Sequence, residues 1–308
     1  MAVIAETMRA AAAEFLDGAP PSARARFEDD DKRRWLEYRP NPRPGASLSA
    51  FRPVTRKAAH RLLATALRPH AFAQAMTIIG LEEVLDRAEG YVRGRHSNDY
   101  WVIVFGDPAR DERWGWRFEG HHVSVTMTID GETVFPTPVF LGANPNAVRY
   151  GDTPVVRPLG LEEDLGFALL DALDPGARAA AIVDPVAPPD IRSGPRPQAP
   201  AELVPLGVPA TGLPEPALAL LGRLVAVYVD RLAEDLAPPV DLDALHFAWQ
   251  GATDPAGGGR YYRIQGPDLL IEFDNTDDDA NHAHTVLRRP ASDFGGVDVL
   301  AQHRAKQH

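Results

Sequence analysis

The sequence predicts an α+β protein in which duplicated antiparallel β-meanders form a sheet or sandwich core, flanked by N-terminal and inserted helices. Apolar residues recur at helical spacing before residue 95 and again over 161–173 and 216–236. Short runs rich in β-branched and aromatic residues alternate with Gly, Asp and Pro over 98–145 and 245–287. The two β-rich regions also resemble each other, which favours a duplicated sheet over separate small sheets.

The N-terminal part, residues 1–95, is predicted to be helical. Apolar side chains follow helical spacing over 2–17, and a Gly-Ala-Pro sequence directly after them ends that helix. Two or three further helices are expected over 55–90, where apolar stripes recur every three or four residues.

The first β-meander is expected over 98–145. Strand-like runs occupy 100–105, 115–129 and 133–141. The Asp130-Gly131 pair between two alternating runs predicts a hairpin turn.

The middle of the chain, 160–216, is expected to contain a helix and a proline-rich strap. Acidic residues in the first turn of the helix at 161–173 interact favourably with the helix dipole. Residues 184–216 contain ten prolines, which excludes regular structure through their length. We expect a strap along the surface of one domain spanning 1–308; a linker between two domains is the alternative.

The second meander and its preceding helix are expected over 217–304. The expected strands and a final short helix lie at 245–250, 260–264, 269–273, 282–287 and 297–304. The sequence at 262–266 matches that at 116–120 in residue type at each position. We interpret this match as an internal duplication, with chance similarity as the alternative. Two copies related by a pseudo-twofold axis would bring distant segments to one site.

Composition excludes several classes of site. The net charge of −11 argues against a general nucleic-acid-binding surface, which needs a basic face. The absence of cysteine excludes disulfides, iron–sulfur clusters and thiolate ligands. No signal-peptide pattern and no membrane-spanning apolar segment is apparent, so a cytoplasmic protein without a membrane partner is expected. The oligomeric state stays open.

Four of the ten histidines lie in two β-type segments, at 119–122 and 281–284. His282 and His284 are two residues apart in a predicted strand, so both side chains point to one face. In the other segment, Glu119 and His121 share a strand face, while His122 takes the opposite and more polar face.

These residue types predict a divalent metal site. We expect His121, His282, His284 and Glu119 to be the metal ligands, and the ion to be Fe, Cu, Zn or Mn. Histidines that are exposed or merely hydrogen-bonded are the alternative interpretation.

Further catalytic candidates are Glu119, His122, Arg117 and Arg263. Arg117 and Arg263 occupy matching positions in the two copies and could hold an anionic substrate by bidentate contact. Structural pairing with Asp107 or Asp254 is an equal alternative.

Several blocks of the sequence resemble the domain of unknown function family number 3500. They are WGWRFEGHH at 114–122, FLGANP at 140–145, YYRIQGP at 261–267, IEFDNT at 271–276, NHAHTV at 281–286 and DFG at 293–295. The chain departs from the family where Leu287 replaces a common aromatic residue and where three aspartates at 277–279 replace an uncharged polar loop. The resemblance implies one continuous domain with an internal strap, and it implies no reaction.

The sequence favours a metal-dependent enzyme that acts on a small-molecule substrate, with a preference for oxidoreductase or oxygenase chemistry because His-dominated ligation suits Fe(II) or Cu. A metal-dependent hydrolase with Glu119 as general base is the first alternative. A non-catalytic carbohydrate- or peptide-binding protein is the second.

Overall fold

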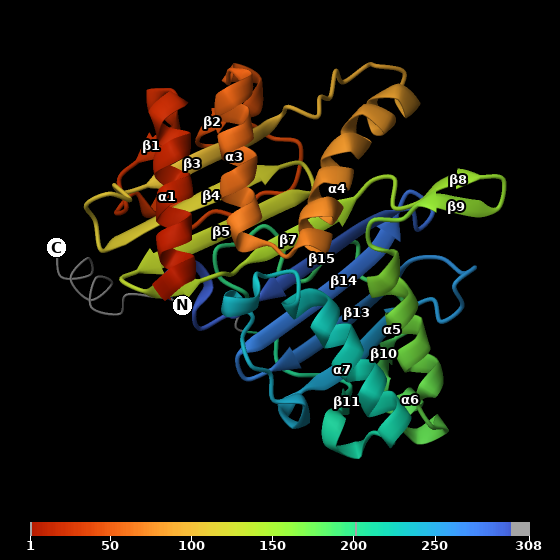
Figure 1. Cartoon of the computed structure of the whole chain (residues 1–308). Coiled ribbons are helices and arrows are strands. Elements are labelled where there is room, and N and C mark those ends of the chain that lie inside the picture. Colours follow the sequence, from red (N-terminus) through yellow and green to blue (C-terminus); the bar gives the residue numbers. More distant parts are fainter. Residues whose placement is uncertain (1, 201, 297–308) are drawn as a thin grey trace.

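The computed structural model describes residues 2–200 and 202–296 (Figure 1). Its predominant feature is a mixed sheet of 13 strands with helices packed against one face. The α+β class predicted from sequence is therefore confirmed, with a sheet rather than a sandwich at its core. The short helix predicted at 297–304 lies outside the described residues. Within them, no helix is both long enough and apolar enough to cross a membrane.

The main path of the sheet runs β1-β3-β4-β5-β7-β15-β14-β13-β12-β10. Its strands are β1 (Arg24–Ala25), β3 (Tyr100–Phe105), β4 (Arg113–Gly120), β5 (Val123–Asp130), β7 (Val139–Ala143), β10 (Ile182–Asp184), β12 (His246–Gly251), β13 (Arg260–Gly266), β14 (Leu269–Asp277) and β15 (His282–Arg288). Off this path, β2 (Ala46–Ser47), β6 (Thr133–Phe135) and β11 (Val208–Pro209) pair with β3, β5 and β12. A separate hairpin of β8 (Val148–Tyr150) and β9 (Thr153–Val156) projects beside the sheet (Figure 1).

The two meanders occupy equivalent halves of this sheet. Antiparallel pairing of β7 with β15 joins them, with Leu141 opposite Thr285. At one edge β1 runs parallel to β3, and at the other edge β10 runs parallel to β12. Strands β2 and β11 add equivalent antiparallel pairs. This repeated topology is what the sequence match between 116–120 and 262–266 predicts.

Helices cover the face of the sheet that carries most of the apolar core (Figure 1). The α-helices are α1 (Ala2–Gly18), α2 (Asp30–Arg33), α3 (Pro53–Ala66), α4 (Pro69–Ala88), α5 (Gly160–Ala172), α6 (Pro175–Ala181) and α7 (Glu215–Val229). Proline within the first two positions begins α3, α4 and α7, where its missing N–H costs no helical hydrogen bond. Helix α1 packs on α3 over the first half, and α5 packs on α7 over the second.

Two segments without strands lie against the other face, one at 26–45, which contains α2, and one at 185–200 and 202–207. We call them the first and second straps. Buried sheet residues bind the second strap: Glu272 accepts backbone N–H groups of Arg192 and Ser193, and Arg263 donates to the carbonyl of Val204. In the first half, Arg117 donates to the carbonyl of Lys32. The proline-rich sequence therefore follows an extended path whose carbonyls accept hydrogen bonds from sheet side chains.

Two predicted strands are interrupted, and the run at 133–141 is divided into β6 and β7. The run at 115–129 is two strands, because β4 ends at Gly120 and β5 begins at Val123. His121 and His122 form the turn between them, and His122 has φ 64°, in the left-handed region that Gly or Asn usually occupies. The sequence argument assigned these histidines by strand alternation, which does not apply within a turn.

Candidate metal centre

The β4–β5 turn places His122 above the middle of the sheet. The backbone N–H of His122 donates to the carbonyl of Tyr38 in the first strap at 3.0 Å, and its carbonyl accepts from the N–H of Gly142 at 2.7 Å. Gly142 in β7 lies opposite His284 in β15. The turn is thus attached to the first strap and to β7, the strand that pairs with β15 of the other half.

Three histidines converge at this point: His122, His282 and His284. Their candidate ligand nitrogens lie within 4.8 Å of one another. The Nε2 atoms of His122 and His282 are 2.9 Å apart. Tetrahedral ligands at about 2.0–2.1 Å from an ion lie about 3.3 Å from one another, so small side-chain shifts would bring all three nitrogens onto one ion.

Gly142 makes this approach of the imidazoles possible. A Cβ atom at position 142 would lie 2.8 Å from Cδ2 of His122 and 3.0 Å from Cδ2 of His284. It would also lie 3.0 Å from the backbone carbonyl of Ala283, which cannot rotate away. Any side chain at this position would separate the histidines.

A carboxylate orients one of the three rings and an amide orients another. Nδ1 of His284 lies 2.8 Å from Oδ1 of Asp190, so Nε2 is left to face the shared point. Nδ1 of His282 accepts from Nδ2 of Asn144 at 3.3 Å, and Oδ2 of Asp278 lies 3.3 Å from the same nitrogen. A carboxylate on the far nitrogen of an imidazole is the usual arrangement around protein-bound metals, because it fixes the tautomer and the ring direction.

Asp190 is itself held in place. Tyr38 donates its hydroxyl to Oδ2 of Asp190 at 2.8 Å, and the Tyr38 ring stacks on Phe140 at 4.1 Å between centroids. Burial acts to raise the pKa of Asp190, but the hydrogen bond and charge of His284 and the bond from Tyr38 lower it overall. This carboxylate therefore stays ionised beside His284.

The local electrostatics keep His122 and His282 neutral. Burial, followed by the neighbouring imidazoles, holds the pKa of His122 well below its usual value. Burial and His284 lower the pKa of His282 to about 4. A neutral imidazole is the form that binds a metal ion, so the fold presents these rings ready for ligation.

A pair of acids lies at the other side of His284. Asp190, Asp274 and His284 also have ligand atoms within 4.8 Å of one another. Burial, followed by the charge of Asp190, raises the pKa of Asp274 to about 8. Asp274 is therefore largely protonated at neutral pH, and Asp190 carries the negative charge of the pair.

The strand argument predicted that His121 would lie with His282 and His284. This prediction is wrong, because the structure places His121 elsewhere. Its Nδ1 lies 2.6 Å from Oε1 of Glu82 on α4 and 3.3 Å from a guanidinium nitrogen of Arg95. The His121 ring stacks on that of His122 at 3.7 Å between centroids. His121 thus supports His122 from behind, and Glu82, His121 and His122 form a separate group whose geometry could hold an ion.

Glu119 also lies elsewhere than expected. It is fully buried, and its Oε2 lies 3.4 Å from Nε of Arg117 and 3.5 Å from Nε of Arg43. Its Oε1 accepts from Ser124 Oγ at 2.7 Å and from the backbone N–H of Glu37 at 3.0 Å. Among the described residues Glu119 belongs to none of the groups with metal-binding geometry. The structure gives it a structural role instead of the predicted ligand role.

The two candidate arginines support the straps. Arg117 donates to Lys32 and pairs with Glu119, and Arg263 donates to Val204 at 3.0 Å. Each is buried within its own half of the sheet. The pairing with Asp107 or Asp254 that the sequence suggested is not present in the described residues.

Sequence reasoning missed Asp190, Tyr38 and Gly142. Asp190 and Tyr38 lie in the straps, whose irregular sequence carries no periodic signal. Gly142 lies in the FLGANP block, where a glycine inside a strand signals a close approach of neighbouring groups.

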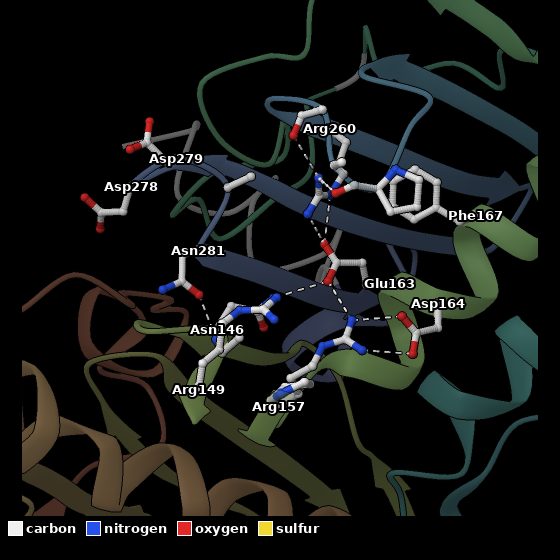
Figure 2. A pocket seen from close by; sticks show the side chains of 16 residues that line it. Asn146, Arg149, Arg157, Glu163, Asp164, Phe167, Arg260, Asp278, Asp279 and Asn281 are labelled. Atoms are coloured by element: carbon white, nitrogen blue, oxygen red, sulfur yellow. Dashed lines mark hydrogen bonds and ion pairs between the residues drawn. The ribbon is translucent and has the colours of Figure 1, made fainter. Parts of the chain in front are cut away.

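A cleft of about 550 Å³ is lined in part by Asp278, Asp279, Ala280 and Asn281, the residues that precede His282 (Figure 2). It shares the Asp278–Asn281 loop with the metal centre, and Asp278 both lines the cleft and faces His282. Three consecutive residues of this loop, Asp278, Asp279 and Ala280, have φ between 51° and 59°. Such left-handed residues cost free energy, and Asn281 restrains the loop by accepting from the N–H groups of Asn146 and Ala147.

Comparison with known proteins identifies the family. The sequence profile described as "Protein of unknown function (DUF3500)" matches residues 1–296, so the chain belongs to this family. No curated protein matches the chain. No solved structure matches it either.

Proposed function

We propose that this member of the DUF3500 family is a metal-dependent enzyme acting on a small molecule at a centre held by His122, His282 and His284. The observation that carries the proposal is the convergence of these imidazoles, with His284 oriented by Asp190. Segments 160 residues apart in sequence meet here across the β7–β15 pair. Buried histidines with a purely structural role do not require Gly142 to let their rings approach.

The ligand set favours a redox-active ion. Three imidazole ligands suit Cu, Fe(II) or Zn, and of these Cu and Fe support oxidation or oxygenation. The bound ion would supply a redox couple or a Lewis acid. Around it, Asp190 would hold the Nδ1 proton of His284, and Asn144 would donate to Nδ1 of His282. We therefore propose oxidoreductase or oxygenase chemistry first.

The hydrolytic alternative loses the general base that the sequence suggested. Glu119 is enclosed by Arg117, Arg43, Ser124 and a backbone N–H, so it has no free path to a bound water. Asp190 is an ionised carboxylate in contact with a proposed ligand, and it could take a proton. A hydrolase that uses Asp190 is the second candidate.

The first experiment measures metal content and affinity. The purified chain, stripped with a chelator and reloaded with Fe(II), Cu(II), Zn(II) or Mn(II), should bind one ion per molecule at the three histidines. Replacing His122, His282 or His284 with Ala should weaken binding by at least about 100-fold, because each contributes one of three ligand bonds. His70→Ala, an exposed histidine on α4, is the matched control and should bind normally.

The outcomes separate the candidates. Unchanged affinity in all three histidine variants would reject the metal centre and leave a non-catalytic binding protein. An electron paramagnetic signal from the Cu- or Fe-loaded chain that is lost in His284→Ala, together with oxygen consumption, would support the redox candidate. Tight binding of Zn alone would favour hydrolysis.

A further inference from the structure

The cleft beside the metal centre contains a fixed and charge-balanced framework. Glu163 accepts from Arg157 at 2.9 Å, from Arg260 at 2.6 Å and from Asn275 at 2.8 Å. Asp164 forms a two-pronged pair with Arg157, at 2.8 and 3.0 Å. Figure 2 shows Glu163 between Arg157 and Arg260, with Asp278 and Asp279 apart from this cluster. Two arginines and two carboxylates thus satisfy one another without a ligand.

Two groups lining the cleft remain outside this framework. Arg149 donates to the backbone carbonyl of Asp152 at 2.8 Å, and no carboxylate of the described residues lies within ion-pairing distance of it. Asn146 is buried, 2% exposed, and its Oδ1 has no hydrogen-bond partner. The amide orientation follows from Glu163, which as a carboxylate can only accept: Nδ2 of Asn146 points to it at 3.4 Å, so Oδ1 points elsewhere.

These two groups define what a ligand must supply. A buried amide oxygen without a donor costs free energy, which a hydroxyl or N–H of a ligand would recover. The Arg149 guanidinium has no carboxylate partner, and the group that suits it best is a planar anion, to which a guanidinium donates two parallel hydrogen bonds. A cleft of about 550 Å³ accommodates a small molecule that carries both.

We propose that this cleft binds a hydroxylated carboxylic acid, with the carboxylate on Arg149 and a hydroxyl donating to Asn146, and that such a molecule is the substrate class of the metal centre. This inference rests on the proposed function. Asp278 forms a wall of the cleft and the carboxylate partner of His282, so a ligand in the cleft lies one side chain away from a proposed metal ligand.

The test compares two probes of the same shape. D-gluconate and D-glucitol are both six-carbon polyols, and only gluconate has a carboxylate. Titration calorimetry on the metal-free full chain should give about tenfold tighter binding of gluconate, the worth of one charged hydrogen-bonded contact at a partly exposed site. In Arg149→Gln the two probes should bind equally.

Two further variants complete the design. Asn146→Ala should weaken both probes about tenfold, because both offer a hydroxyl to the amide oxygen. Arg110→Gln, an exposed arginine far from the cleft lining, is the control and should change neither affinity. Arg149 is exposed, so Arg149→Gln should fold normally. It keeps the test valid even if Asn146→Ala, which removes a contact with Glu163, lowers the stability of the protein.

The proposal is overturned if the wild-type chain binds neither probe at 10 mM-scale concentration, about the weakest affinity that a small ligand in a formed cleft shows. Equal binding of both probes, or a gluconate preference that persists in Arg149→Gln, would overturn it too. Measuring probe binding and metal binding on the same wild-type chain separates the two proposals. Probe binding without metal binding rejects the metal centre alone, and metal binding without probe binding rejects the cleft alone.

Discussion

The two halves of the sheet close equivalent hairpins with different chemistry. The β4–β5 turn is His121-His122, and the β13–β14 turn is Pro267-Asp268. In the second half Asp268 pairs with Arg289 at 2.9 Å, an ordinary ion pair near the surface. In the first half His122 meets two histidines from the other half of the chain. The duplicated frame sets where a turn lies, and the two turn residues set what it can bind.

The residues just before the turns differ in the same way. Glu119 in β4 neutralises Arg117 and Arg43, whereas its counterpart Gln265 in β13 donates to the carbonyl of Leu203 in the second strap. A carboxylate is needed only where two buried guanidiniums approach. The four predictions that follow test this contrast between a structural network and a metal centre in adjacent positions.

The largest expected effect is on stability. Glu119→Gln should lower the free energy of unfolding by about 3–5 kcal/mol, because it leaves Arg117 and Arg43 buried without a counter-charge. Metal stoichiometry of the folded variant should not change. Urea denaturation and metal analysis on one preparation check both points, with Gln265→Ala as the control, for which about 1 kcal/mol is expected. If the folded Glu119→Gln variant no longer bound metal, Glu119 would again be a candidate metal ligand.

Gly142→Ala should weaken metal binding about 100-fold, because the new methyl group separates the His122 and His284 rings. The same overpacking should cost about 1–3 kcal/mol of stability. Gly80→Ala in α4 is the matched control, since a Cβ there meets nothing within 4 Å. Wild-type affinity in Gly142→Ala would show that the ion does not bind between these rings.

Asp190→Asn should weaken metal binding about tenfold, since the amide keeps the shape of the carboxylate and loses its charge on His284. The equivalent change at the other turn, Asp268→Asn, should leave metal binding unaltered. Competitive titration against a chelator measures both. Equal effects of the two variants would mean that long-range charge, rather than orientation of His284, controls affinity.

The smallest expected effect is on acid stability of the metal-free chain. The folded-state pKa of His282, about 4, lies below the unfolded value near 6.5, so protonation favours unfolding. The stability contribution is complete above pH 6.5 and is lost as the pH falls toward 4, by at most about 1.4 kcal/mol per pH unit. Denaturation at pH 7.5, 6 and 5 should show a steeper loss in the wild type than in His282→Gln. Parallel curves would contradict a buried neutral His282.

Part of the site was predictable from sequence. Alternation along a strand correctly places His282 and His284 on one face, because they lie within β15. The duplication predicts that the two histidine segments meet. The choice of His121 over His122 was wrong because it extended strand alternation through a turn. The run at 115–129 is longer than an ordinary strand and contains Gly120, and both features indicate a break within it.

The sequence by itself determined the α+β class, the longer helices, most of the central strands, the repeat and the histidine segments, because these depend on periodicity and local turn chemistry. Only the tertiary structure decided which histidine joins the cluster, that Gly142 admits it, and that Asp190 and Tyr38 support it from the straps. The straps have no periodic pattern, and their positions depend on hydrogen bonds from buried sheet side chains such as Arg117, Arg263 and Glu272. Those contacts join residues far apart in sequence, so no local pattern specifies them.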